Sequence, residues 1–259
     1  MKRRIIALII GFFLAASFCA AQDLSVAAAA DLQFAFQDVA ARFEKDTGHH
    51  VQLIFGSSGN FYTQIQNGAP FDLFFSADVD YPKKLEAAGL TEPGSLYEYA
   101  TGKLVLWVPQ QSPLVLTRGL PVLLDPRVKK IAIANPQHAP YGRAAVAALQ
   151  HEKLYERITD KLVLGENISQ TASFVVSGSA DIGMVALSLA LAPSMKDKGR
   201  YVNVPVDDYP AIVQGAVILK SSKQSALAHQ FLSFLKSPAM IELMKTYGFV
   251  IPEGNPTTR

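Results

Sequence analysis

The segment LSVAAAADLQFAFQDVAARFEKDTGHHVQLIF, residues 24–55, predicts a strand, a helix and a second strand in succession. The apolar run over residues 24–30 is typical of a buried strand, and apolar residues at every second position over 51–55 are typical of another. Between them, apolar side chains recur at helical spacing until Gly48, a residue type that often ends helices. These side chains are Leu32, Phe36, Val39, Ala40 and Phe43.

The rest of the chain repeats this alternation of short apolar runs and amphipathic helical patterns, with Gly, Ser, Asn and Pro at the junctions. Alternating strands and helices predict an α/β fold built from mostly parallel sheets flanked by helices. Further strands are predicted over residues 72–75, 103–108, 130–134, 161–164, 182–185, 201–204 and 211–219, and further helices over 61–66, 82–88, 144–155, 169–177, 224–236 and 239–247.

The pattern breaks near residues 96–102 and again near residues 204–214, where Pro205, Asp207, Asp208 and Pro210 interrupt it. If the chain crosses between two lobes at both places, residues 101–210 form a second lobe inserted into a first lobe of residues 22–100 and 211–259. Two lobes joined by two strands form a hinged cleft, and open α/β sheets bind ligands at the carboxyl ends of their strands. We therefore expect a two-lobe fold with a ligand site in the cleft.

The first 21 residues have the layout of a secretory signal peptide. Lys2, Arg3 and Arg4 precede an uncharged run over residues 5–16, which is shorter than the about 20 apolar residues of a spanning helix. Cleavage after Ala21 would remove the single cysteine, Cys19, and leave a periplasmic protein without thiols or disulfides. A lipid anchor on Cys19 is the alternative, although a bulky Phe18 before it is a poor match to a lipoprotein cleavage site.

The composition is that of a globular protein, with 49% hydrophobic and 18% charged residues in a chain of 259. The formal net charge is +2, and loss of the three basic residues in the predicted signal peptide leaves −1. Nucleic-acid-binding domains normally carry an excess of basic residues. We therefore expect no nucleic-acid partner.

Four predicted strand-to-helix junctions carry small, hydroxylated or amide residues, over residues 30–33, 56–60, 135–142 and 166–170. The first two fall in the first predicted lobe and the last two in the second. The start of a helix offers free N–H groups and a partial positive charge, so two such ends on each side of a cleft could enclose a small oxyanion without a cation. Ser and Asn are also common helix caps, and each junction alone equally fits simple capping.

At these junctions the sequence resembles the periplasmic molybdate-binding proteins of ABC importers. The matching stretches include GSSG at 56–59, QIQNGAPFDLFFSAD at 64–78, IAIANPQHAPYGRAA at 131–145 and ENISQTASFVVSGSADIGMVAL at 166–187, and the resemblance covers nearly the whole mature chain. It implies two α/β lobes that close on molybdate or tungstate, held by hydroxyls and main-chain amides. It also implies a non-enzymatic, monomeric protein that needs no cofactor, binds molybdenum only as its oxyanion and delivers it to an ABC permease.

The resemblance implies a role in ligand binding for three positions of this sequence. Ser58, the second serine of GSSG, matches a serine that donates its hydroxyl and its amide. Tyr141 matches a tyrosine ligand found in one branch of the family, and Ile168 matches a position that contributes its backbone N–H.

The first junction departs from the family pattern, because Ala30 and Asp31 stand where many relatives have Ser, or Thr followed by Asn. A carboxylate that faced a dianion would repel it. We therefore expect Asp31 to offer its amide, while its side chain caps the helix or turns away. The alternative is that Asp31 accepts a proton from a protonated anion, which would favour a phosphate-like ligand. Sulfate and phosphate therefore stay open as ligands beside molybdate.

The residues also allow two other classes of function. An exported hydrolase would need an activated nucleophile, but GSSGN is not the G-x-S-x-G elbow, and of the five histidines only His138 lies beside a predicted junction. A cation-binding transport protein could use His49 and His50, but adjacent side chains on an extended segment point to opposite faces. Arg143, which follows APYG, either faces solvent or adds positive potential to the cleft.

Overall fold

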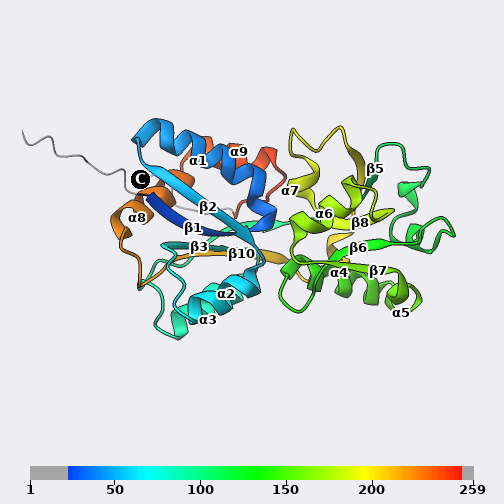
Figure 1. The fold of residues 1–259 in the computed structure, drawn as a ribbon, viewed down its shortest axis with the longest axis horizontal. Helices are drawn as coiled ribbons and strands as arrows, with labels where there is room; N and C mark the ends of the chain where they lie inside the picture. The colour runs from blue at the N-terminus through cyan, green and yellow to red at the C-terminus, as the bar shows by residue number, and fades with distance from the viewer. Residues whose placement is uncertain (1–22, 253–259) are drawn as a thin grey trace, which may run out of the picture.

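The computed structural model of the protein describes residues 23–252, and in this part of the chain ten strands form two five-stranded sheets (Figure 1). The first sheet has the order β2-β1-β3-β10-β4 and the second has the order β7-β6-β8-β5-β9. The strands of the first sheet are β1 (Asp23–Ala29), β2 (His50–Gly56), β3 (Leu73–Ser76), β4 (Tyr97–Gly102) and β10 (Ile212–Ile218). The strands of the second are β5 (Leu104–Pro109), β6 (Ile131–Ala134), β7 (Leu162–Gly165), β8 (Ile182–Ala186) and β9 (Gly199–Asn203). Each sheet with its helices is called a lobe below, and the two-lobe α/β fold is as predicted.

Helices cover both faces of the first sheet (Figure 1). On one face lie α1 (Gln33–Thr47), α8 (Ser225–Leu235) and α9 (Pro238–Thr246), and on the other lie α2 (Ser58–Gln66) and α3 (Asp80–Ala87). Successive residues of a strand point to opposite faces, so Phe75 packs edge-on against Phe36 and Phe231, while Phe74 packs with Phe61 and Leu85. The five apolar residues predicted for the buried face of α1 are all buried, and the helix ends at Gly48 with a left-handed φ of 76°.

The second sheet is covered by α4 (Pro140–His151) on one face and α6 (Ile168–Val176) on the other (Figure 1). Shorter helices fill the connections of this lobe. They are α5 (Tyr155–Ile158), α7 (Leu187–Ala190), and the 3-10 turns η2 (Leu116–Arg118), η3 (Leu120–Leu124), η4 (Thr159–Lys161) and η5 (Val206–Asp208); a further turn, η1 (Ala30–Leu32), follows β1 in the first lobe.

The share of parallel pairing is smaller than predicted. Each sheet has two parallel pairs, β1 with β2 and β3, and β6 with β7 and β8, and its other two pairs are antiparallel. The antiparallel strands are those next to the crossings between the lobes. Because these strands are entered from the other lobe rather than through a strand–helix–strand unit, they are free to run in the opposite direction.

The chain crosses between the lobes twice. It leaves the first sheet at the end of β4, and β5 begins after the single residue Lys103; it returns after β9, and β10 begins at Ile212. The predicted lobe boundaries, after residues 100 and 210, lie beside these crossings. Strand β4 lies where the sequence pattern breaks, near residues 96–102, and no strand was predicted there. Its Tyr97 and Tyr99 are buried, and Glu98 between them is exposed.

Helix α4 begins earlier than predicted, at Pro140 rather than at residue 144. Proline is favoured in the first turn of a helix, where its missing N–H costs no hydrogen bond. Gly142 in the same turn lies so close to β6 that a Cβ on it would be 2.1 Å from the carbonyl oxygen of Ala134. Tyr141 is thereby placed in the first turn of a helix rather than in a loop.

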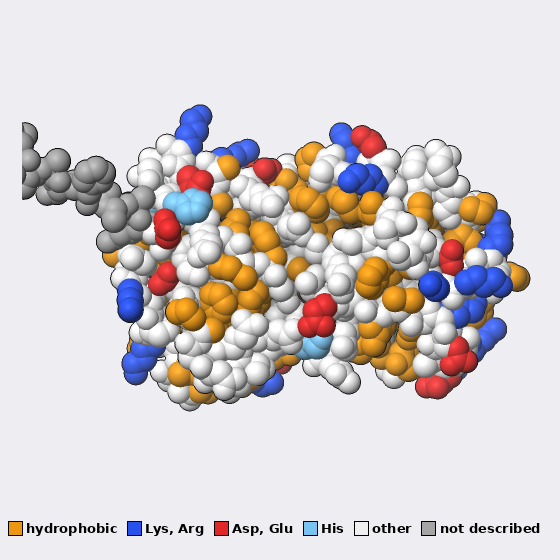
Figure 2. Space-filling model, viewed as in Figure 1, with side chains coloured by type: hydrophobic (Ala, Val, Ile, Leu, Met, Phe, Trp, Pro, Cys, Tyr) orange, Lys and Arg blue, Asp and Glu red, His pale blue; other side chains and the backbone are white. Residues whose placement is uncertain are grey.

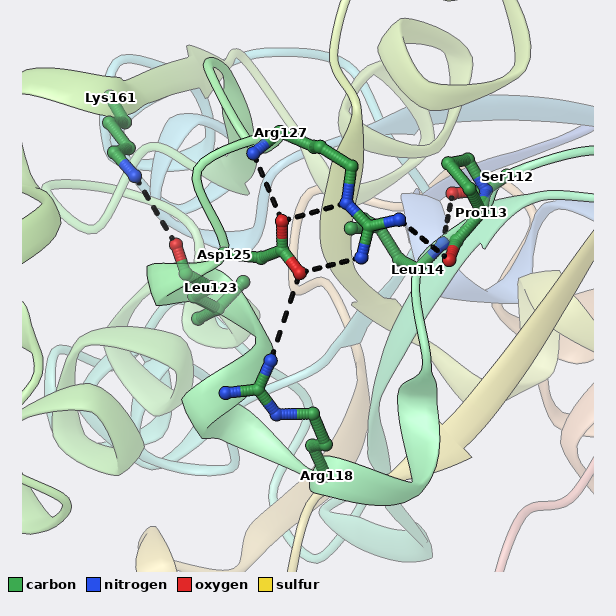
Figure 3. A network of polar contacts seen from close by, with 8 residues as sticks. All are labelled: Ser112, Pro113, Leu114, Arg118, Leu123, Asp125, Arg127 and Lys161. Atoms are coloured by element: carbon green, nitrogen blue, oxygen red, sulfur yellow. Dashed lines mark hydrogen bonds and ion pairs between the residues drawn. The ribbon is translucent and has the colours of Figure 1, made fainter.

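A charged network holds the connection between β5 and β6 together at the far end of the second lobe (Figure 3). Asp125 is buried, and Arg127 donates to both of its carboxylate oxygens, from Nε at 2.9 Å and from Nη2 at 2.7 Å. Arg118 lies 3.7 Å from the same carboxylate, and Arg127 also donates to the carbonyl of Pro113. These contacts hold the pKa of Asp125 well below its usual range, the hydrogen bonds from Arg127 being the main cause.

Over the visible face of the molecule, positive and negative side chains are interspersed on both lobes and form no large basic surface (Figure 2). Within residues 23–252 there is no helix long and apolar enough to cross a membrane. The predicted signal peptide and Cys19 lie outside the described residues.

Candidate functional site

A small cavity lies between the two lobes, where the four predicted junctions meet. Ala29 and Gly56 at the carboxyl ends of β1 and β2 line it from the first lobe. The five residues expected at the site all line it: Ala30, Asp31, Ser58, Tyr141 and Ile168. The structure thus brings together residues that are up to 138 positions apart in the sequence.

Two helices begin at this cavity, one from each lobe. α2 begins at Ser58 and α6 begins at Ile168, and each is capped by the side chain of the preceding residue, Ser57 or Asn167, which accepts a backbone N–H two residues into the helix. The N–H groups of Ser58 and Ile168 have no partner within their helices. The positive ends of both helices are therefore available to an anion from opposite sides.

Ser58 is fully buried and has one hydrogen bond that fixes its hydroxyl. Its Oγ accepts the backbone N–H of Ala77, which follows β3, at 2.9 Å. A hydroxyl that accepts one hydrogen bond keeps its own proton to donate. Ser58 can therefore donate from both its hydroxyl and its backbone amide, as the family resemblance implies. Ala30 has no polar side-chain atom and offers only its backbone.

Asp31 lies in η1 and is 1% exposed. Its Oδ2 accepts hydrogen bonds from Tyr141 Oη at 3.1 Å and from Gln214 Nε2 at 2.6 Å, and its main-chain carbonyl accepts from Ser188 of the second lobe. Among the described residues Oδ1 has no partner. Burial raises the pKa of Asp31 to about 6, against the opposing effect of the bonds from Gln214 and Tyr141. Of the two expected placements of this side chain, capping the helix or turning away, capping is wrong: the side chain does not cap the following helix and lies against Tyr141 and Gln214 instead.

Tyr141 reaches across from the second lobe, and its hydroxyl is directed at Asp31 of the first. Burial and the nearby Asp31 carboxylate raise the pKa of this tyrosine well above its usual value, so the hydroxyl is a donor. Its approach requires Gly102, because a Cβ there would lie 2.1 Å from Tyr141 Oη. Tyr141 lines the cavity, but its hydroxyl already bonds Asp31.

Gln214 belongs to this cluster and was missed from the sequence. It lies in β10 with no exposed surface, and its Nε2 is also 3.3 Å from Tyr141 Oη. An amide side chain in the middle of the apolar strand IVQGAVI was the available signal, because a buried amide needs a partner.

Polar contacts between the lobes surround the cavity and hold the structure closed. The N–H of Gly59 donates to the carbonyl of His138 at 2.9 Å, and Asn60 Nδ2 donates to Glu166 Oε1 at 2.6 Å. Arg143 pairs with Asp78 of the first lobe and donates to Tyr81. The charge of Arg143 is thus matched by a carboxylate outside the cavity. This pair also lines the larger groove beside the cavity, together with the exposed carboxylate of Asp80.

The rival functions find little support in the geometry. His138 Nδ1 lies 2.8 Å from Ser57 Oγ, and that oxygen also accepts the N–H of Asn60 as the cap of α2, which explains its position without a catalytic role. His50 pairs with Glu44 instead of with His49. In residues 23–252, one set of three side chains has the spacing of metal ligands, His151, Glu152 and Asp208, and it lies away from the cavity.

Residues 24–250 match the family model described as bacterial extracellular solute-binding protein. The chain is 45% identical to the molybdate-binding protein ModA of Azotobacter vinelandii over 89% of this chain and 92% of that protein. It is 41% identical to the molybdate-binding protein ModA of Rhodobacter capsulatus over 95% and 94% of the two chains. The solved structure of the periplasmic molybdate-binding protein of Azotobacter vinelandii superposes with a TM-score of 0.84, covering 89% of this chain and all of that one.

Proposed function

The chain belongs to the bacterial extracellular solute-binding protein family, and we propose that it captures molybdate, and also tungstate, in the periplasm and delivers the anion to an ABC permease. The observation that carries this function is the cavity where the N-termini of α2 and α6 and the hydroxyl of Ser58 converge. Neutral donors of this kind, fixed in place, suit a small tetrahedral oxyanion.

The donors of the cavity select their ligand by size. A closed cavity with fixed donors that fits a tetrahedral anion as large as molybdate leaves gaps around the smaller sulfate. Donors left unpaired in a buried site weaken binding. Tungstate is almost the same size as molybdate, so the cavity accepts it as well.

The protein acts as a monomeric binding protein without a cofactor or a catalytic step. Molybdenum is bound as its oxyanion, through hydrogen bonds to oxygen, and no side chain coordinates the metal atom. The permease recognises the closed form, which the contacts between Asn60 and Glu166 and between Arg143 and Asp78 hold together.

Thermal unfolding of the mature protein with molybdate, tungstate, sulfate or phosphate tests this function. A ligand present at about 1,000 times its dissociation constant contributes about 4 kcal/mol, which for a chain of this size raises the unfolding midpoint by about 8–16 °C. We expect this shift with molybdate and tungstate alone. A shift only with sulfate or phosphate would show a different oxyanion as the ligand, and no shift with any of the four would contradict oxyanion binding.

Ser58→Ala tests the site itself by calorimetric titration with molybdate. Loss of a donor to a charged ligand should weaken binding by about 1–3 kcal/mol. The matched control is Ser233→Ala, an exposed serine of α8 on the outer side of the first lobe. Equal affinities of the two variants would contradict the assignment of Ser58.

A further inference from the structure

The carboxyl group of Asp31 is satisfied on one oxygen only. Both of its donors, Tyr141 Oη and Gln214 Nε2, bond Oδ2, whereas Oδ1 is buried and has no partner among the described residues. A buried polar atom without a partner is rare in folded proteins and calls for a physical explanation. Because Asp31 lines the cavity, Oδ1 is the atom left for a ligand.

No positive charge within the described residues compensates this carboxyl. The ionisable groups that face it are Tyr141 from α4 and Tyr99 from β4, both of them neutral phenols whose pKa burial raises well above the usual value. Helices α6 and α7, which pack against η1, contain no ionisable side chain. The nearest arginine of α4, Arg143, is paired with Asp78.

An ionised Asp31 would therefore face a doubly charged anion across a small buried cavity, with no cation of the described residues to reduce the repulsion. A protonated Asp31 has the opposite effect. Its neutral carboxyl group presents one acceptor oxygen and one O–H donor, the same pair that the amide of an asparagine presents.

We propose that Asp31 binds the oxyanion as a neutral carboxylic acid, with the proton on Oδ1 donated to an oxygen of the ligand, so that each captured dianion takes one proton from solvent. The inference rests on the function proposed above and specifies how that site recognises its anion. With the amide of Gln214 oriented as in the structure, Nε2 toward Asp31, both Gln214 and Tyr141 donate to Oδ2, so that oxygen is the acceptor and the proton is placed on Oδ1. No bond of the anion changes, and the proton returns to solvent when the lobes open.

The raised pKa of the buried Asp31 carboxyl agrees with this assignment. Burial raises the pKa of Asp31 to about 6, so in neutral buffer the unliganded carboxyl is mostly ionised and must gain a proton on binding. Binding that requires the protonated form weakens tenfold for each pH unit above this pKa.

Calorimetric titration with sodium molybdate, repeated in buffers of different ionisation enthalpy, measures the protons taken up. The proteins compared are the wild type, Asp31→Asn and the matched control Asp46→Asn, which removes an exposed carboxylate near the far end of α1. At about pH 7.5, we expect the wild type and the control to take up about one proton for each molybdate bound, and Asp31→Asn to take up none. Between about pH 6 and 8 the wild-type affinity should fall roughly 50-fold, while that of Asp31→Asn stays constant.

Three results would contradict a proposal, and they differ in which proposal they overturn. Tight molybdate binding by the wild type with no proton uptake and no pH dependence would overturn the role of Asp31 and leave molybdate capture standing. Absence of binding of molybdate and tungstate by wild type and Asp31→Asn at every pH would overturn the proposed function itself. Binding of phosphate without proton uptake would mean that an ionised Asp31 accepts a proton carried by the ligand, which also overturns the inference. If Asp31→Asn fails to fold, the proton count and pH profile of the wild type decide alone.

Discussion

Asp31 and Asp125 are both almost completely buried, at 1% and 7% exposure, but their surroundings differ in charge. Asp125, at the far end of the second lobe, is held by two arginines, and its pKa is well below the usual range (Figure 3). Asp31, between the lobes, has only neutral donors on one oxygen, and burial raises its pKa to about 6. Burial alone therefore does not determine the charge of a carboxyl group; its partners do.

The two carboxyl groups also differ in which lobes their hydrogen bonds join. The ionised Asp125 has all its hydrogen bonds within one lobe, where they order the connection between β5 and β6. Asp31 contacts Tyr141 and Ser188 of the opposite lobe, and one of its oxygens is left without a partner. An unpartnered group at the contact between moving parts destabilises the empty protein, and it is tolerated where a ligand supplies the missing bond.

The largest expected effect is on the stability of the protein without ligand. The pKa of Asp31 is raised from 3.8 to about 6, so the folded state binds more protons than the unfolded state between these values and loses stability as the pH rises through them. Above about pH 6 the ionised carboxylate costs about 3 kcal/mol, and Asp31→Asn should recover this amount. Urea denaturation of both proteins at about pH 7.5 and at about pH 4 measures this difference in stability. The gain in free energy of unfolding of Asp31→Asn over the wild type should vanish at the lower pH. An equal gain at both pH values would contradict the raised pKa of Asp31.

Gly102→Ala should act on the closed form of the same cluster. The added Cβ would lie 2.1 Å from Oη of Tyr141, which reaches Gly102 from the opposite lobe. Crowding of this size costs about 1–3 kcal/mol, so molybdate affinity should fall by about 5- to 150-fold. Calorimetric titration measures the affinity, and the unfolding midpoint without ligand is the control. Unchanged affinity would mean that Tyr141 does not occupy this position in the liganded protein.

Tyr141→Phe should have a smaller effect, because it removes one of the two donors to Asp31 Oδ2 and leaves Gln214 in place. Loss of one hydrogen bond between the lobes should weaken molybdate binding by about 0.5–1.5 kcal/mol. With one fewer donor to the ionised form, the pKa of Asp31 should rise further, and the decline of affinity with pH should begin at a higher pH. Titrations over a pH series separate these two effects. A decline that begins at the wild-type pH would contradict the contact between Tyr141 and Asp31.

The smallest effect is expected at Asp125, because the side chains of Arg118 and Arg127 are about half exposed and water screens their charges. The pKa of Asp125 is lowered in the folded state, so its stabilising effect is present above the pKa of the unfolded chain and is lost as the pH falls through the folded-state value. Asp125→Asn should lower the unfolding midpoint at neutral pH, by an amount that shrinks in acid, while leaving molybdate affinity unchanged. A midpoint equal to that of the wild type would mean that the network adds nothing to stability, and an altered affinity would contradict its separation from the site.

The helices and strands with strong periodicity could be predicted, and the weakly patterned ones could not. The buried face of α1 and its end at Gly48 follow from apolar spacing and from the left-handed backbone that glycine adopts readily. Strand β4 was missed because the segment YEYATG combines aromatic, charged and small residues, and its burial depends on neighbouring β10. The start of α4 was placed late because Pro and Gly in its first turn also fit a loop.

The sequence by itself determined the α/β alternation and the junctions where helices begin, because helix capping and apolar periodicity are local properties. The family resemblance at these junctions added five residues that are among those lining the cavity. Only the tertiary structure decided what Asp31 does. Its partners, Tyr141 and Gln214, are 110 and 183 positions away in the chain, and whether a carboxyl group is paired with a cation or left neutral depends on what the fold packs around it. The sequence contained the aspartate that replaces a family donor; the fold placed one of its oxygens, without a partner, beside the cavity.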